Sequence, residues 1–328
     1  MIRRAIAAAV LLAAAGTASA FVRETTVPGD PTAGKCLYWG TRTVPYRVNS
    51  TSAAAPPLRP ACPTCAPCQD ATAATALITA TLPAWGGATQ AGAAQACTDF
   101  NLQYGGTSTS TTLGNDGVNL VVFRTGWCAN ANLVPLNDPC RATVGACAAK
   151  YNCWEHDASG TIGLTTITFT TSTGAMIDAD IEFHGWDGDS NGYYLTCPAS
   201  PACSNPPFGQ VNCTAVDVGS VALHEAGHVV GLDHTCVYPA PNNACPPNSV
   251  MQPTIPNGTT RRNLDADDVN GICTIYPRGG ATLTCGSGGG GGGSTSTGGG
   301  GCSSGGQGGW LALAAAALGV FRMRRRRE

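Results

Sequence analysis

Apolar and polar residues alternate along several short stretches of the chain, and this pattern predicts β-strands. Residues 42–50 (RTVPYRVNS) alternate, while residues 117–125 (GVNLVVFRT) form a β-branched and apolar run typical of a buried strand. Residues 163–185 (GLTTITFTTSTGAMIDADIEFHG) indicate two strands joined by a turn from Thr171 to Gly174. These strands are expected to pair in one sheet.

Two other stretches favour helices. Residues 71–85 (ATAATALITATLPAW) favour a helix that Pro83 interrupts. Residues 217–232 (DVGSVALHEAGHVVGL) place apolar side chains on one helical face, at Val218, Val221, Ala222, Ala226 and Val229. Strands followed by such a helix predict an α+β domain.

The second predicted helix leads into HEAGHVVGLDH, residues 224–234, which holds three of the five histidines of the chain. His224 and His228 are four residues apart, so a helix places both imidazoles on one face, where they can bind one ion. Gly231 can take the left-handed conformation that ends a helix, and the resulting turn lets His234 approach from another direction. Three neutral nitrogen ligands leave one tetrahedral position for water, the arrangement of a catalytic Zn²⁺ site.

Glu225 lies beside this metal site without being forced to bind the ion. Zinc lowers the pKa of a bound water from about 16 toward about 7 and polarises a peptide carbonyl. Glu225 is then expected to act as general base and to pass the proton to the leaving amine. The alternative is a disulfide-rich surface adhesion or binding module with a structural metal, for which Asp233 is a candidate fourth ligand.

The motif resembles the extended zinc-binding motif of metzincin metalloproteases. Met251, seventeen residues after His234, matches the methionine of the Met-turn that lies beneath the zinc in that family. The stretch NLDADDVNGICTIYP resembles the closing helix of the matrixin, or matrix-metalloprotease-like, branch, with Asp267 and Asp268 as its paired aspartates. AMIDADIEFHG resembles the matrixin edge strand that borders the cleft.

The resemblance implies a metzincin-like catalytic domain with a twisted mixed sheet, an antiparallel edge strand, an active-site helix and a C-terminal helix. It implies a zinc metalloendopeptidase with ligands His224, His228 and His234, and a specificity pocket partly walled by the segment through Pro253. Protein or peptide substrates would bind in extended form along the edge strand near Met176 to Phe183. The chain departs from the family in its many cysteines and in lacking a conventional cysteine-switch pro-domain.

WDGDSNG, residues 186–192, is a candidate Ca²⁺ site, because Asp187, Asp189 and Asn191 are spaced like the start of a calcium loop. The usual closing glutamate is missing, and Pro198 stands in its place. A solvated polar turn is the alternative. His156 and His184 are candidates for a second, structural zinc site.

Residues 1–20 have a basic start, an apolar run and a small-residue end, as in a secretory signal peptide cleaved after Ala20. Export places the 17 cysteines of the 328-residue chain in an oxidising compartment, so most are expected in disulfides. Without the arginines of the two terminal segments and Glu328, 11 basic and 19 acidic residues give the core a net charge of −8. This charge argues against nucleic-acid binding.

The chain is expected to contain a protease domain at 21–280, a Gly/Ser-rich linker at 281–309 and a hydrophobic helix with an arginine-rich tail at 310–328. Cys302, the Gly/Ser spacer, the short helix and the arginines together resemble C-terminal sorting tags of myxobacterial type. That resemblance implies transient membrane association of a bacterial protein that ends at the cell surface, at the outer membrane or outside the cell. Separately, the protein is expected to be a monomer. An uncleaved membrane anchor is the alternative.

Overall fold

The computed structural model describes residues 21–50, 71–156, 161–184, 194–197, 215–236, 246–256 and 259–285. The predicted signal segment 1–20 lies outside these ranges, as do the candidate calcium residues Asp187, Asp189 and Asn191 and residues 286–328 of the linker and tail. In the part of the chain that is described, no helix combines the length and the apolar character that a membrane crossing needs.

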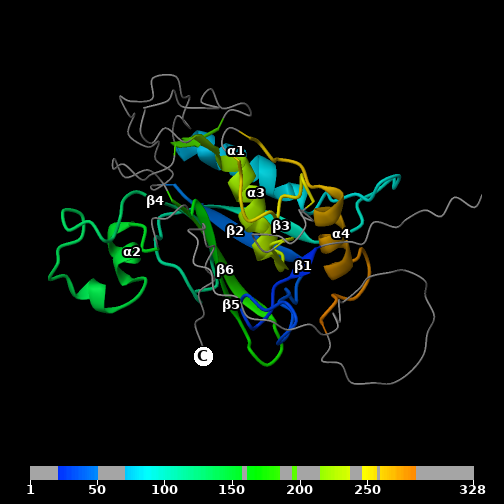
Figure 1. The fold of residues 1–328 in the computed structure, drawn as a ribbon, viewed down its shortest axis with the longest axis horizontal. Helices are drawn as coiled ribbons and strands as arrows, with labels where there is room; N and C mark the ends of the chain where they lie inside the picture. The colour runs from blue at the N-terminus through cyan, green and yellow to red at the C-terminus, as the bar shows by residue number, and fades with distance from the viewer. Residues whose placement is uncertain are drawn as a thin grey trace, which may run out of the picture.

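A five-stranded mixed sheet forms the centre of the domain, with strand order β3-β2-β4-β6-β5 (Figure 1). The strands are β2 (Thr43–Asn49), β3 (Asn101–Ser108), β4 (Asn119–Arg124), β5 (Gly163–Phe169) and β6 (Met176–His184). All neighbouring pairs are parallel except β5 and β6, which are antiparallel. The sequence pattern predicted β2, β4, β5 and β6, but β3 was missed because its exposed, glycine-containing stretch lacks an apolar run.

The antiparallel edge strand is β5, and the expectation that residues Met176 to Phe183 form the edge was wrong. These residues belong to β6, which pairs with β4 on one side and with β5 on the other. A strand paired on both sides has no backbone groups left for a substrate. The hydrophobic pattern predicted both strands of the hairpin but could not tell which one is outermost, because that depends on pairing with β4.

Two helices, α1 (Ala71–Thr81) and α3 (Val218–Val229), pack against each other on one face of the sheet (Figure 1). A short 3-10 turn, η1 (Leu82–Ala84), follows α1 and carries Pro83, as the sequence predicted. Trp85 comes next and is fully buried, and its indole Nε1 donates to the Leu223 carbonyl at 3.0 Å. The turn after α1 thereby fixes the position of α3.

Helices α3 and α4 both begin at an aspartate whose side chain caps the helix. Asp217 caps α3 by accepting hydrogen bonds from the backbone N–H and the hydroxyl of Ser220, and Arg262 forms an ion pair with it. Helix α4 (Ala266–Ile275) begins with a capping box between Asp265 and Asp268. The cap at Asp217 explains why α3 begins where its apolar periodicity begins.

The N-terminal segment is structured, although no element was predicted before residue 42. Strand β1 (Val22–Arg23) pairs with β9 (Leu232–Asp233), the two-residue strand just before His234. Gly231, at the end of α3, has φ of +94°, and a Cβ there would lie 2.7 Å from the Leu37 carbonyl oxygen. Glycine is therefore required both by the left-handed turn and by the close approach of the N-terminal segment.

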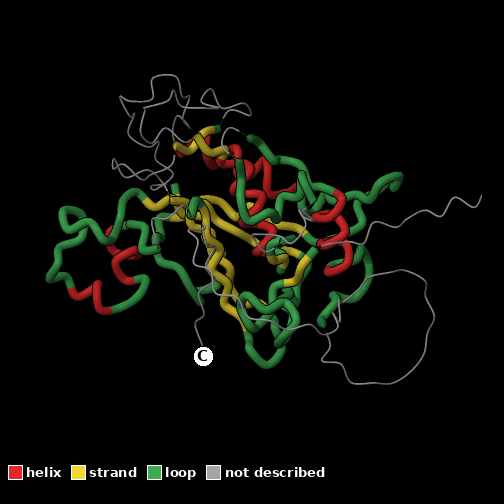
Figure 2. The backbone as a smooth tube through the Cα atoms, in the orientation of Figure 1, coloured by secondary structure: helices red, strands yellow, loops and turns green. Residues whose placement is uncertain are grey.

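Disulfides link distant parts of the domain, as the cysteine content predicted. The described pairs are Cys36–Cys285, Cys97–Cys273, Cys128–Cys153 and Cys140–Cys147. The first pair joins residue 285 to the N-terminal segment, and residue 285 lies five positions after the expected domain end at 280. The last two pairs enclose a small separate core around α2 (Ala146–Tyr151), which lies to the side of the sheet in Figures 1 and 2.

The Cys36–Cys285 disulfide is predicted to stabilise the fold more than the Cys140–Cys147 disulfide. The first joins residues 249 apart and the second residues 7 apart, so the first restricts the unfolded chain more. Replacing both cysteines of each pair by alanine should cost about 3 kcal/mol more for the first pair. Urea unfolding of the two double variants measures this difference, and equal losses would contradict the prediction.

Candidate metal centre

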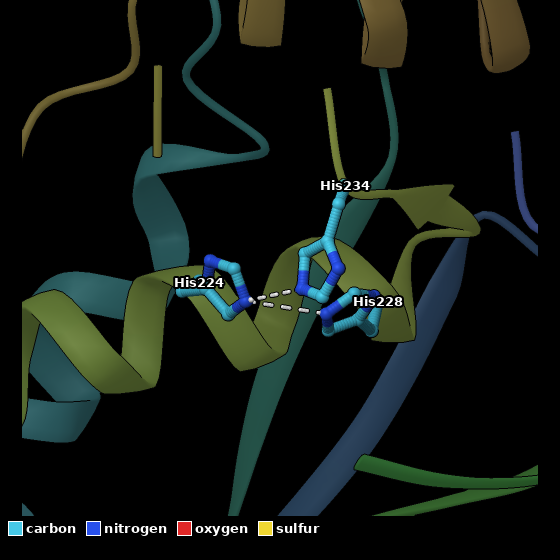
Figure 3. A group of neighbouring side chains, drawn as sticks. All are labelled: His224, His228 and His234. Atoms are coloured by element: carbon cyan, nitrogen blue, oxygen red, sulfur yellow. Dashed lines mark hydrogen bonds between the residues drawn. The ribbon is translucent and has the colours of Figure 1, made fainter. Parts of the chain in front are cut away.

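Three histidines from two elements converge at the C-terminal half of α3 (Figure 3). The Nε2 atom of His224 lies 3.2 Å from Nε2 of His228 and 3.3 Å from Nε2 of His234. His224 and His228 are buried and His234 is half-buried. Among the described residues, this is the one group of His, Cys, Asp or Glu side chains placed to share a metal ion.

The partners of the other ring nitrogens decide which atoms can bind a metal. Nδ1 of His224 lies 2.6 Å from the Val250 carbonyl oxygen, and Nδ1 of His228 lies 2.8 Å from Glu24 Oε1 and 2.9 Å from the Leu232 carbonyl oxygen. These partners are all acceptors, so each Nδ1 carries the proton. The Nε2 lone pairs of the neutral rings therefore face the shared space, as metal ligation requires.

The spacing of the ligand atoms fits zinc. Zn–N bonds of 2.0–2.1 Å at tetrahedral angles place two nitrogens about 3.3–3.4 Å apart. The observed Nε2 separations of 3.2 and 3.3 Å are close to that value. Three imidazoles without a negatively charged ligand also form the donor set of catalytic rather than structural zinc sites.

Burial changes the proton affinity of the three rings. Burial, together with the neighbouring His228, lowers the pKa of His224 to about 3, and the same two causes lower the pKa of His234. Burial also opposes a charge on His228, but Glu24 outweighs it and raises the pKa of His228 to about 9. Metal binding therefore requires His228 to lose one proton, after which all three rings are neutral.

Glu225 is fully buried, and burial raises the pKa of its carboxyl to about 7. Its Oε2 atom accepts a hydrogen bond of 2.7 Å from the hydroxyl of Thr165 on β5. Its Oε1 atom has no hydrogen-bond partner within the described part of the chain. A Cβ at Gly163 would lie 2.6 Å from this oxygen, so glycine in β5 leaves the space that the carboxylate occupies.

Met251 packs against α3 at Gly227, between the first two histidines, and α4 holds the turn that carries it. A Cβ at Gly227, on the helix between the first two histidines, would lie 2.1 Å from Met251 Sδ. Asp268 accepts hydrogen bonds from the Ser249 hydroxyl at 2.8 Å and from the Val250 N–H at 2.9 Å. The Val250 carbonyl in turn accepts from His224, so a continuous chain of contacts runs from α4 to the first ligand.

The remaining predicted residues have different environments. Asp267 is buried on α4, beside Asp268, and Pro253 is half-buried two residues after Met251. The role of Pro253 in a specificity pocket stays a prediction. Sequence reasoning missed four residues that contact the site, because each acts through tertiary contacts that no local motif reveals: Glu24, Trp85, Gly163 and Thr165.

His156 and His184 do not share a metal-binding arrangement in the described structure. Nε2 of His156 contacts Glu182 Oε2 at 3.1 Å, and Nδ1 of His184 contacts the Thr161 carbonyl oxygen at 3.1 Å. Trp154 stacks on His184 and meets His156 edge-on, with ring centroids 4.6 and 4.9 Å away. Glu182 also pairs with the fully buried Arg124, so an ion pair occupies this side of the sheet.

The region that holds this site is similar to known metalloproteinases. Residues 151–277 match the matrixin family model. The chain is 30% identical to metalloendoproteinase 5-MMP of Arabidopsis thaliana over 137 residues, which are 34% of this chain and 35% of that protein. It is 44% identical over 62 residues to metalloendoproteinase 2-MMP of Arabidopsis thaliana, covering 19% of this chain and 14% of the relative. It is 40% identical over 63 residues to metalloendoproteinase 1 of Glycine max, and these residues are 19% of this chain and 18% of that protein.

These matches span no more than about a third of the relatives' own lengths. The matched region holds the antiparallel strands β5 and β6, the histidine-bearing helix α3 and the closing helix α4, and the three parallel strands that precede it complete an α+β architecture with a mixed sheet. The predicted fold class is thereby confirmed.

The triad predicts one zinc ion per chain, bound through His224, His228 and His234. His234→Ala should remove one of three ligands, abolish stoichiometric zinc binding and remove the rise in melting temperature that zinc produces in the parent protein. His156→Ala is the matched control, because it removes a histidine outside the triad. Metal analysis and thermal melts check both variants, and one tightly bound zinc in His234→Ala would contradict the ligand set.

Gly227 is predicted to be required for the contact with Met251. Gly227→Ala gains about 1 kcal/mol of helix propensity, but its methyl group displaces Met251 and Trp85, and overpacking of this kind costs about 1–3 kcal/mol. We therefore expect a lower melting temperature and weaker zinc binding. Gly40→Ala is the control, since no atom lies within 4 Å of its added Cβ. A Gly227→Ala variant as stable as the parent would show that Met251 is free to move.

Proposed function

We propose that the part of this chain containing the matrixin domain is a zinc-dependent endopeptidase that acts on protein or peptide substrates. The observation that carries the proposal is the convergence of three histidines beside the buried Glu225, which lies on the same helix as two of them. A structural zinc site would use a fourth protein ligand. No fourth His, Cys, Asp or Glu joins the triad among the described residues, which favours catalysis over an adhesion module with a structural metal.

His224, His228 and His234 would hold the zinc ion, which supplies Lewis-acid polarisation of the scissile carbonyl and acidifies the attacking water. Glu225 Oε1 would accept the proton of that water and deliver it to the leaving nitrogen. The hydrogen bond from Thr165 holds the other carboxylate oxygen, so Glu225 keeps one orientation through both transfers. A carboxyl pKa near 7 suits a group that both accepts and donates a proton at neutral pH.

The open side of β5 supports binding of an extended peptide. The N–H of His184 donates to the Ile162 carbonyl, and antiparallel pairs alternate between bonded and non-bonded positions. The backbone groups of Gly163, Thr165 and Ile167 therefore point away from β6, and no described strand pairs with β5 on that side. A substrate would add a strand there, directly beside Glu225.

Export and surface display are further parts of the proposal. The signal-like residues 1–20 and the disulfides are typical of a protein that folds in an oxidising compartment. The Gly/Ser-rich segment and the arginine-rich end support transient membrane attachment through a C-terminal tag. A tagged chain with residues 310–328 deleted, followed by cell fractionation, would separate anchoring from release.

Glu225→Gln is predicted to keep zinc and lose turnover. The amide cannot accept the proton of the water, so kcat on a peptide library should fall by about 10²–10⁴-fold. Glu155→Gln is the control, because Glu155 lies outside the centre and its carboxylate accepts from the Gly145 N–H. Metal analysis is run on the same samples, and a chelator should abolish the activity of the parent protein.

Cleavage at the parent rate by Glu225→Gln, with zinc bound, would overturn the assigned mechanism. Zinc binding by the parent protein without any cleavage in the library would instead favour the structural-metal alternative.

A further inference from the structure

The N-terminal segment forms part of the wall of the metal centre. Its strand β1 pairs with β9, and the Glu24 N–H donates to the Gly231 carbonyl at 3.0 Å. Trp39 lies farther along the same segment, and its indole Nε1 donates to the Val229 carbonyl at 2.7 Å. Residues 229–233 form the turn between the second and third histidines, so the segment is held on both sides against that turn.

The side chain of Glu24 in this segment contacts a predicted ligand, His228. Its carboxylate is fully buried, and Oε1 lies 2.8 Å from Nδ1 of His228. Its Oε2 atom has no hydrogen-bond partner in the described structure. A buried carboxylate with an unpaired oxygen destabilises a fold, so its presence here points to a role in the site and not in stability.

The three histidines are not supported in the same way. His224 donates its Nδ1 proton to a backbone carbonyl, whereas His228 faces a carboxylate. A carboxylate partner fixes the ring orientation, keeps the proton on Nδ1 and makes Nε2 a stronger donor to a cation. The negative charge of Glu24 also offsets part of the charge that a Zn²⁺ ion brings into a buried centre.

We propose that Glu24, supplied by the N-terminal segment, is a positioning residue that orients His228 and strengthens zinc binding. This inference rests on the proposed metal centre. Glu24 touches neither substrate nor ion, so it acts only through the imidazole. The segment that follows the predicted cleavage site would then be a component of the site itself.

The Leu232 carbonyl oxygen is a second acceptor for the same Nδ1 proton, at 2.9 Å. The test must therefore separate a need for Glu24 from a need for any acceptor. Glu24→Leu keeps the side-chain volume and removes the acceptor and the charge. Glu24→Gln keeps an oxygen that can accept from Nδ1 and removes only the charge.

The measurement is zinc affinity of the full chain by competition with a chromophoric chelator, together with the absorption spectrum of the cobalt-substituted protein. Glu24→Leu should weaken zinc binding by about 10–100-fold and change the cobalt spectrum. Glu24→Gln should restore the ring orientation and with it the parent spectrum, and its zinc affinity should lie between those of Glu24→Leu and the parent. Glu155→Gln is the control carboxylate and should bind zinc as the parent does.

Equal zinc affinity of Glu24→Leu and the parent would overturn the proposal, because the Leu232 carbonyl would then suffice. A lower melting temperature of metal-free Glu24→Leu with unchanged zinc affinity would also overturn it, since that result describes a purely structural role. Failure of the parent protein to bind zinc would refute the metal centre itself, and this result is distinct from a failure of the role assigned to Glu24. Because the affinity is measured without substrate, loss of protease activity alone has no bearing on Glu24.

Discussion

The Nε2 atoms of His228 and His234 lie 3.2 and 3.3 Å from Nε2 of His224, and nitrogen lone pairs at this spacing repel one another unless a cation or a proton lies between them. Holding them in that arrangement inside a buried space requires that each ring be fixed from behind. His224 is held by the Val250 carbonyl and His228 by Glu24 and the Leu232 carbonyl. Contacts from α4 and from the N-terminal segment keep these acceptors in place.

The supports come from segments that are far apart in the chain. Helix α4 fixes the Met-turn through Asp268, and the turn presents both the carbonyl that holds His224 and the side chain of Met251. The N-terminal segment fixes the turn after α3, and the Cys36–Cys285 disulfide joins that segment to the C-terminal end of the domain. Both ends of the folded chain are thus tied to the centre that they help to build.

The sheet contributes to the site through its edge strand. Gly163 and Thr165 of β5 contact Glu225, one by leaving space for the carboxylate and the other by donating a hydrogen bond. The same residues present their backbone groups on the open side of the strand. Orientation of the general base and alignment of an extended substrate would therefore depend on the same few residues, which explains why the antiparallel strand lies next to α3.

The ligand set was readable from the sequence because a helix converts a four-residue spacing into a shared face, and a glycine marks where that helix ends. The strands of the β5–β6 hairpin could be predicted for the same local reason, whereas α4 was expected only from the resemblance to matrixins. Which strand forms the edge, and which carboxylate supports His228, depended on contacts between residues up to about 200 positions apart. No local pattern records such contacts, since a buried glutamate and a glycine in a strand acquire their roles only from what folding places beside them.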